Sequence, residues 1–391
     1  TMTVTVTVSG ADDAVSAGGD QTGAVTEDAT ATTATGTVAA SDDDADSAFT
    51  YAIGTAAGTY GSLAIDSAGA WTYTIDNSAA ATTALDAGDA PTDAFTITVT
   101  DTSSTLTDTM TVTVTVSGAD DAVSAGNDGT GAVTEDATAT TATGTVVASD
   151  ADADSAFTYA IGTAAGTYGT LTMTGADWTY TIDNSAAATN ALAHDGSGND
   201  VFTITVTDTS STLTDDMTVT ITVSGANDDP TLATAQADAS AAEDAAYSLD
   251  VSGNFADVDV GDSLSYTATG MPSTMTMSTA GVLSGTPVNA NVAAHTVVVT
   301  ATDGTASVTD TFDVTVTNTN DAPTVASAIS DVSSAEDAAY SLDVSGTCTD
   351  VDVGDSLAYT MSGAPSTLSI ASGTISGTPL NADVGAHTIT V

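Results

Sequence analysis

The sequence predicts an all-β protein, a linear array of tandem β-sandwich domains. The four glutamates recur at Glu27, Glu135, Glu243 and Glu336, with spacings of 108, 108 and 93 residues. Large apolar residues alternate with Thr or small residues, as half-buried strands require. Strong helical periodicity is missing, apart from a short Ala-rich stretch at 78–85. We therefore expect about seven strands in each repeat.

The repeats divide the 391 residues into units of two related types. Residues 1–18 reappear unchanged at 109–126, and near-identity continues beyond them. A second module begins near residue 226 and is marked by the segment AYSLDVSG, at 246–253 and again at 339–346. We predict a closing strand of a preceding or neighbouring domain at 1–10, sandwiches at 11–118, 119–225 and 226–318, and a fourth sandwich at 319–391 that lacks its last strand.

The strands of the first module follow from residues spaced by two positions, which lie on the same face of a strand. Each predicted segment has Phe, Tyr, Trp, Ile, Leu, Met or Val at every second position. In the first copy these segments are 49–53, 63–65, 71–75, 95–99 and 110–116; in the second they include 157–161, 178–182, 202–206 and 217–223.

The composition leaves the acidic residues without positively charged Lys or Arg partners in the chain. The chain has 52 Asp and Glu residues and no Lys or Arg, giving a formal charge of −52. This charge argues against nucleic acid and anionic membrane surfaces as partners. No apolar stretch approaches the roughly 18 residues that a membrane helix needs. The single cysteine, Cys348, cannot form a disulfide within the chain. Counter-charge must therefore come from cations in solution.

Acidic residues recur in each unit as a junction pair, a Glu-Asp pair, an Asp-x-Asp run and, in the first three units, a late Asp. Ca²⁺ prefers roughly six to eight oxygen ligands of these kinds. We therefore predict Ca²⁺ as the cofactor, with folding bringing the segments together. The predicted ligands are Asp12, Asp13, Glu27, Asp28, Asp42, Asp44 and Asp101 in the first unit; Asp120, Asp121, Glu135, Asp136, Asp150, Asp152 and Asp208 in the second; Asn227, Asp228, Glu243, Asp257, Asp259, Asp262 and Asp303 in the third; and Asn320, Asp321, Glu336, Asp350, Asp352 and Asp355 in the fourth. Asp46 and Asp154 extend the first two runs.

Any single Asp has a simpler explanation, because its short side chain hydrogen-bonds its own backbone in turns. A chain adapted to high salt could also be acidic everywhere for solubility. The recurring set taken together favours metal binding over both explanations. The strict spacing of an EF-hand loop is missing, so a helix-loop-helix site is not predicted.

Several motifs resemble known repeat families. The segment VTEDATATTATGTVAASDDDADSAFTYAI, closed by TVTDTSSTLTDTMTVTVTVSGADDA, resembles a cadherin-like domain. The elements YGSL at 60–63, WTYT at 71–74 and DAFTITVTD at 93–101 are more closely similar to VCBS-type repeats. From residue 226 the chain resembles dystroglycan-type cadherin-like, or immunoglobulin-like, repeats, through NDAP at 320–323 and LSGTP at 283–287.

This resemblance implies tandem sandwiches of bacterial surface adhesins, with Ca²⁺ at the domain junctions. The first two units depart from the family pattern, because they have Ala-Asp-Asp-Ala where Asn-Asp-x-Pro is usual. The departure puts in doubt how their junctions would bind metal.

We predict an extracellular or cell-surface structural or adhesive protein, a Ca²⁺-rigidified stalk or filament whose partners are further repeats or other copies of the chain. No enzyme is predicted, because a nucleophile elbow and a phosphate-binding loop are both missing. One alternative is a self-polymerising fibre subunit, completed by strand donation between copies. Another is a module that binds glycans or surfaces. Fibre growth by purified copies would favour the first alternative, and glycan binding by one isolated unit the second.

Overall fold

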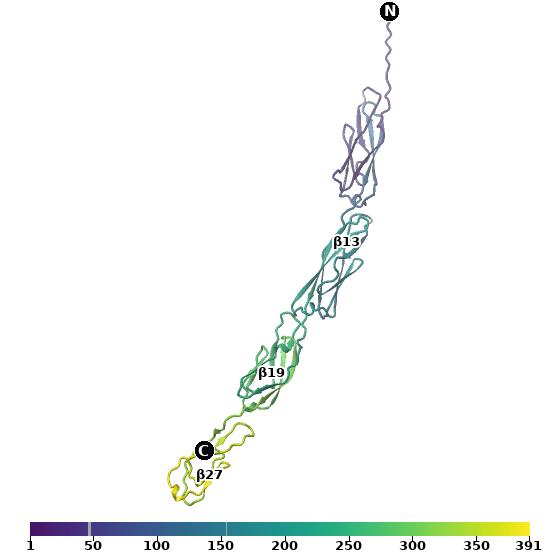
Figure 1. The fold of residues 1–391 in the computed structure, drawn as a ribbon. Coiled ribbons are helices and arrows are strands. Elements are labelled where there is room, and N and C mark those ends of the chain that lie inside the picture. Colours follow the sequence, from purple (N-terminus) through teal and green to yellow (C-terminus); the bar gives the residue numbers. More distant parts are fainter. Residues whose placement is uncertain (46–47, 154) are drawn as a thin grey trace. The chain divides into compact units, whose positions relative to one another are not determined.

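A computed structural model describes residues 1–45, 48–153 and 155–391. It divides into two compact units, residues 1–226 and 227–391, drawn from purple to yellow in Figure 1. The described residues contain β-strands and only three short 3₁₀ helices, which confirms the predicted all-β class. None of their helices is long and apolar enough to cross a membrane.

The first domain of the first unit is a sandwich of two sheets. Its first strand lies parallel to its last, with Gln21 opposite Val112 and Thr26 opposite Ser117. The other pairs are antiparallel. One sheet has the order β1 (Gln21–Thr26), β7 (Thr107–Ser117), β6 (Thr92–Asp101), β3 (Phe49–Ile53); the other has the order β2 (Thr33–Thr37), β5 (Ala70–Ile75), β4 (Gly61–Ile65).

The second domain repeats this topology, including the parallel pairing of its first and last strands. One sheet has the order β10 (Phe157–Ile161), β13 (Ser197–Asp208), β14 (Thr214–Ser224), β8 (Gly129–Thr134); the other has the order β11 (Gly169–Thr174), β12 (Asp177–Ile182), β9 (Thr141–Thr145).

The second unit contains shorter strands of the same general arrangement. Its sheets have the orders β16 (Ala239–Ala242), β23 (Ser307–Thr317), β22 (Ala294–Thr302), β19 (Ser265–Thr269), and β17 (Tyr247–Asp250), β21 (Val282–Gly285), β20 (Met275–Met277), with the pair β15 (Thr231–Leu232), β18 (Phe255–Ala256). Towards residue 391 lie the pair β24 (Thr324–Val325), β26 (Cys348–Thr349) and the sheet β25 (Tyr340–Asp343), β28 (Thr374–Gly377), β27 (Leu368–Ala371). The 3₁₀ helices are η1 (Ser252–Asn254), η2 (Asn289–Asn291) and η3 (Asn381–Asp383).

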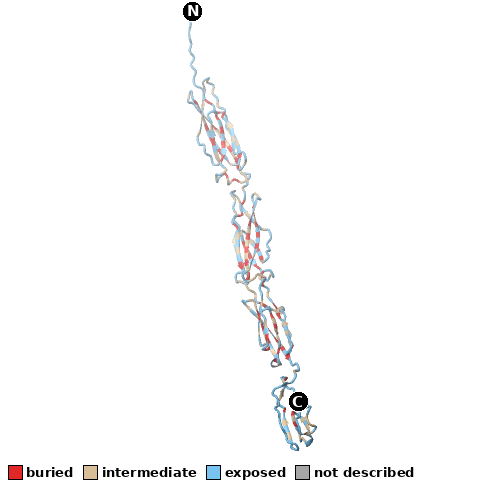
Figure 2. Ribbon diagram, turned by 90° about the vertical axis from the view of Figure 1, so that its left-hand side faces the viewer, coloured by how far each residue is buried: buried red, intermediate tan, exposed pale blue. Residues whose placement is uncertain are grey.

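Each domain of the first unit has its own core, built from the alternating residues of the predicted strands. Figure 2 shows buried and more exposed residues alternating along these strands. Ile97 and Val112 are fully buried, and the rings of Tyr73 and Phe95 pack with centroids 5.8 Å apart. Burying such side chains contributes about 1.5–3 kcal/mol each. The alternation seen in the sequence therefore does mark the core face.

Four strands of the first unit were missed by the sequence analysis because they contain almost only Gly, Ala and Thr. They are β1, β2, β8 and β9. The small residues have a packing reason: a Cβ on Gly36 would lie 2.5 Å from the ring of Trp71. These strands provide a close backbone surface for the large residues of their neighbours. Their sequences therefore show no alternation of large apolar and small residues.

Residues 1–10 form no strand and are exposed; their assignment as the closing strand of a preceding or neighbouring domain stays a prediction. The same ten residues at 109–118 form most of β7, which is hydrogen-bonded between β6 and β1. A strand needs partners for its backbone donors and acceptors, and β7 has one on each side. The predicted domain boundaries themselves stay a prediction.

Candidate metal sites

Glu27 follows β1 and places its carboxylate at the end of the first domain. Its backbone N–H donates to Ser117 O (3.0 Å), which continues the pairing of β1 with β7. Its Oε1 accepts a hydrogen bond from the N–H of Ala119 (2.8 Å). The side chain is only 4% exposed. Glu27 therefore contacts the segment that leads into the second domain.

The segment after Ala119 brings further acidic residues to the same place. The backbone N–H of Asp121 donates to Asp152 Oδ2 (2.8 Å), and that of Asp152 donates to Asp150 Oδ1 (3.2 Å). Asp152 is 6% exposed. The Asp-x-Asp run of the second domain is thus held against the junction pair by hydrogen bonds.

The electrostatics of this group are unfavourable for carboxylates alone. Burial raises the pKa of Glu27, and the charges of Asp121, Asp28 and Asp152 raise it further. Burial also raises the pKa of Asp121 and of Asp152, again with neighbouring carboxylates adding to the effect. Within the described ranges, Asp152 Oδ1 and Asp150 Oδ2 are buried without a hydrogen-bond partner. Both observations fit carboxylates that would share a bound cation.

The second unit contains the same arrangement between Glu243 and the residues after β23. Glu243 Oε1 accepts from the N–H of Thr319 (2.7 Å), and its side chain is 1% exposed. The N–H of Asp321 donates to Asp352 Oδ2 (2.7 Å), and that of Asp352 to Asp350 Oδ1 (3.0 Å). Glu243 Oε2 and Asp352 Oδ1 are among the described buried oxygens that have no partner.

Two predicted runs of the second unit each bring three carboxylates together. Each offers three carboxylate oxygens within 4.8 Å of one another. Asp259 also accepts from the N–H of Asp228 (3.0 Å), and Asp303 accepts from the Nδ2 of Asn227 (3.0 Å). Burial raises the pKa of Asp259. The runs are Asp257, Asp259, Asp262 and Asp350, Asp352, Asp355.

Near the start of the first domain the predicted ligands form a looser group. The N–H of Asp13 donates to Asp44 Oδ2 (2.8 Å), and the N–H of Asp44 donates to Asp42 Oδ1 (3.0 Å). Asp12 is exposed. Asp46 and Asp154, which extend the Asp-x-Asp runs in the sequence, lie outside the described residues.

The late Asp residues of the first unit have internal partners instead. Asp101 Oδ2 accepts from the hydroxyls of Ser103 and Ser104 (2.6 Å each), and Asp208 is held in the same way by Ser210 and Ser211. The serine hydroxyls lower the pKa of both carboxylates. The structure therefore gives these two acids a turn-forming role; their metal ligation stays a prediction.

The remaining predicted ligands lie as follows. Asp120 Oδ1 accepts from the N–H of Ala87 (3.0 Å), and Asn320 Nδ2 donates to Asp321 O (2.8 Å). Asp28 and Asp136 have left-handed backbones, with φ of 52° and 51°. Glu135 is buried and Glu336 is exposed.

One buried acid in each of the first two domains was missed as a site by the sequence analysis. Asp93 Oδ2 accepts from the hydroxyl of Tyr73 (2.8 Å), and its carboxylate also accepts from the N–H groups of Thr59 (2.8 Å) and Tyr60 (3.0 Å). Asp200 makes the matching contacts in the second domain. The only sequence signal was an Asp at a core-facing position of a strand.

Family models match most of the chain. The model described as Bacterial cadherin-like domain matches residues 11–118 and 119–225. The model described as Putative Ig domain matches residues 229–317 and 322–391. No curated protein matched the sequence. The VCBS-type assignment of the first two domains stays a prediction.

Solved structures of protocadherins have a similar fold. Protocadherin Gamma B2 extracellular cadherin domains 1–5 match with a TM-score of 0.52 and 16% identity, over 77% of this chain and 60% of that one. PcdhgB3 EC1–4 matches with a TM-score of 0.50 and 14% identity, over 94% of this chain and 91% of that one. The chain thus spans less than two thirds of the first structure. At these identities the likeness concerns the fold alone.

Proposed function

Because the chain belongs to the family of bacterial cadherin-like domains, which covers residues 11–225, we propose that it is an extracellular or cell-surface structural or adhesive repeat protein with Ca²⁺-binding junctions. The observation that carries the proposal is the convergence of Glu27, Asp121 and Asp152 where one domain meets the next. The equivalent residues Glu243, Asp321 and Asp352 converge in the second unit.

The residues at these junctions fit a hard divalent cation. The side-chain atoms that would bind the ion are all carboxylate oxygens, which Ca²⁺ prefers. Several are buried without a hydrogen-bond partner among the described residues, including Asp152 Oδ1 and Glu243 Oε2. The sequence has no Lys or Arg that could neutralise them. We infer that Glu27, Asp28, Asp121, Asp150 and Asp152 hold the ion in the first unit, and that Glu243, Asp321, Asp350 and Asp352 do so in the second.

A bound ion would supply positive charge to the carboxylates of two successive domains. Glu27 belongs to the first domain, Asp121 to the linking segment and Asp152 to the second domain, so one cation restricts how the domains pivot. Extracellular modules bind Ca²⁺ with Kd of about 10⁻⁴ to 10⁻³ M, so the sites fill in millimolar Ca²⁺. A stalk or filament made of such repeats would stiffen outside the cell, with further repeats or other copies of the chain as its partners.

The test is removal of Ca²⁺ from the full 391-residue chain. We expect EGTA to lower the thermal midpoint by calorimetry and to change the X-ray scattering profile towards that of a flexible string. At a Ca²⁺ concentration about 100-fold above Kd, each site contributes roughly 2.7 kcal/mol. Added Ca²⁺ should restore both readouts.

The control separates binding from general screening, because any salt weakens repulsion among exposed carboxylates. NaCl of matched ionic strength should restore little of either readout. An unchanged midpoint and unchanged scattering in EGTA would falsify the proposal, and full recovery with NaCl alone would reduce it to a screening effect.

A further inference from the structure

In the first domain, the side-chain amide of Gln21 bridges the two sheets. Trp71 Nε1 donates to Gln21 Oε1 (2.7 Å), and Gln21 Nε2 donates to the carbonyl of Thr37 (2.6 Å). An indole donor and a backbone acceptor therefore lie at the two ends of one carboxamide. Gln21 comes from β1, whereas Trp71 and Thr37 lie on β5 and β2 of the opposite sheet.

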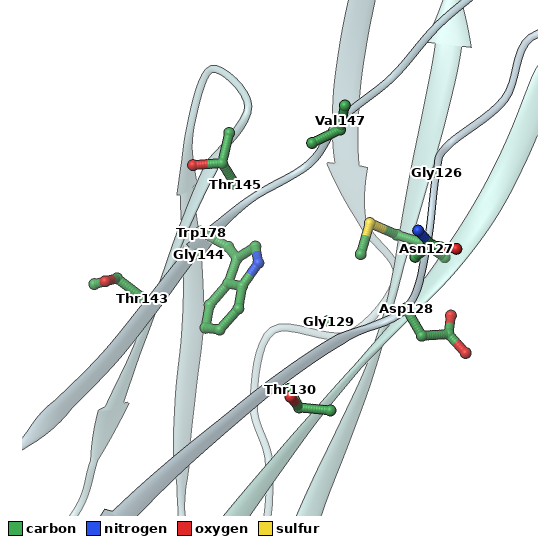
Figure 3. Close-up of a pocket in the computed structure, with 11 residues that line it drawn as sticks. Gly126, Asn127, Asp128, Gly129, Thr130, Thr143, Gly144, Thr145, Val147 and Trp178 are labelled. Carbon is green, nitrogen blue, oxygen red and sulfur yellow. The ribbon is translucent and has the colours of Figure 1, made fainter.

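The second domain has the same donor and acceptor but lacks the glutamine, since Gly129 stands in its place. A Cβ on Gly129 would lie 3.5 Å from Trp178 Nε1. In the described part of the chain, the hydrogen bond of Trp71 has no counterpart at Trp178. The indole instead lines a pocket of about 450 Å³ that is partly open to solvent, shown in Figure 3 and called the Trp178 pocket below. Its volume lies in the range of small-molecule sites, about 300–1,000 Å³.

The acceptor of the Trp178 pocket is available because β9 is an edge strand. Thr145 lies opposite Asp177 on β12, and the neighbouring Val146 N–H donates to Ala176 O (2.9 Å). This pattern makes Thr145 and Asp177 a non-hydrogen-bonded pair, so the Thr145 carbonyl points away from β12. Thr37 has the same pairing and gives its carbonyl to Gln21.

Between residues 11–53 and 119–161, most of the differences between the two copies lie at this pocket. Val147 and Asn127 line it together with Gly129 and Met217. Val147 is 75% exposed and provides an apolar wall where the first domain has only alanine. Four residues differ between residues 11–53 and 119–161: Gly19 to Asn127, Gln21 to Gly129, Ala39 to Val147 and Asp43 to Ala151. The first three of these exchanges line the pocket.

We propose that the Trp178 pocket binds a primary carboxamide, either a small free amide or the side chain of a glutamine in a peptide. A carboxamide supplies an acceptor for the indole N–H and a donor for the Thr145 carbonyl, as Gln21 does in the first domain. A carboxylate of the same shape has no donor, and Asp128 beside the pocket repels it. The site is separate from the acidic junctions and does not depend on Ca²⁺.

The experiment follows the indole N–H signals of the ¹⁵N-labelled chain, whose only two tryptophans are Trp71 and Trp178. The probes are propionamide, the peptide acetyl-Ala-Gln-Ala-N-methylamide and its Glu counterpart, with propionate as the small anionic control. We expect a saturable shift of the Trp178 signal with propionamide and no shift of Trp71. A response to the Gln peptide as well assigns the site to peptide side chains, and a response to propionamide alone assigns it to free amides.

Two reciprocal variants test whether the exchange of Gln21 for Gly129 is what makes the pocket available. Gly129→Gln should fill the pocket and abolish the response, and it is tolerable because the equivalent neighbours Val112 and Met110 accommodate Gln21 in the first domain. Gln21→Gly should make the Trp71 signal respond to propionamide. The proposal is overturned if Trp178 stays unresponsive up to the solubility limit of propionamide, or if propionate shifts it equally.

Discussion

Two buried carboxylates of the first domain have the same charge and the same 4% exposure, yet opposite surroundings. Asp93 accepts three hydrogen bonds, from Tyr73, Thr59 and Tyr60. Glu27 accepts one from Ala119 and otherwise faces carboxylates, so its pKa is raised. The comparison shows that burial alone does not identify an acid that requires a cation. The distinguishing property is whether the protein supplies donors.

The largest effect is expected where the donors are internal. Asp93→Ala leaves three donors without their acceptor, and we expect a loss of about 3–5 kcal/mol of unfolding free energy. The loss should be equal in Ca²⁺ and in EGTA. Urea unfolding followed by Trp71 fluorescence, in a Trp178→Phe background, measures the first domain alone. The exposed Asp89→Ala serves as the control, and a Ca²⁺-dependent loss at Asp93 would remove the contrast with Glu27.

A smaller effect, with a sign that depends on Ca²⁺, is expected at the junction. Asp152→Asn removes one ligand, so in saturating Ca²⁺ it should cost up to about 2.7 kcal/mol. In EGTA the same change removes a repelling charge and should raise the thermal midpoint slightly. Asp216→Asn, at an exposed position, should do neither. A loss of equal size in both buffers would mean that Asp152 has a purely structural role.

The smallest effect is a shift of stability with pH in EGTA. The pKa values of Glu27, Asp121 and Asp152 are raised by burial, so stability should increase as pH falls from neutral through those raised values. Asp101 and Asp208 have lowered pKa values, so their contribution is kept until pH falls below the ordinary carboxyl value, about 4. Calorimetry across pH should therefore show a mildly acidic maximum.

Ca²⁺ should reverse the first part of that profile, because protons displace the ion from the carboxylates. With Ca²⁺ present, the midpoint should fall steadily from neutral pH downward. Identical profiles in Ca²⁺ and EGTA would contradict the assignment of the junction acids as metal ligands.

Much of the fold was readable from the sequence, since large residues at every second position mark β6 and β7 and their buried faces. Strands without large residues were not readable, because Gly36 and its neighbours are small in order to accommodate Trp71. The decamer TMTVTVTVSG shows the limit most directly. It lies mostly within a strand at 109–118 and in none at 1–10, so its conformation depends on hydrogen-bonding partners rather than on its own residues.

The candidate sites also divide into those that the sequence could indicate and those that it could not. Recurrence along the chain indicated that Glu27 and Asp152 belong to one set, and the structure brings both to the same junction. It could not indicate that Asp101 is held by Ser103 and Ser104, because a carboxylate in a turn and one facing a cation have the same side chain. The Trp178 pocket was also hidden, since it depends on contacts across two sheets.

The parallel pairing of first and last strands has a mechanical consequence. In the first domain β1 and β7 lie side by side over six residue pairs, and β8 and β14 do the same in the second. Tension applied at the two ends of either domain pulls these strands along their length in opposite directions. Their hydrogen bonds are then loaded in shear and must break together rather than one after another. Each domain is thereby suited to resist stretching, which single-molecule force spectroscopy would register as a high rupture force.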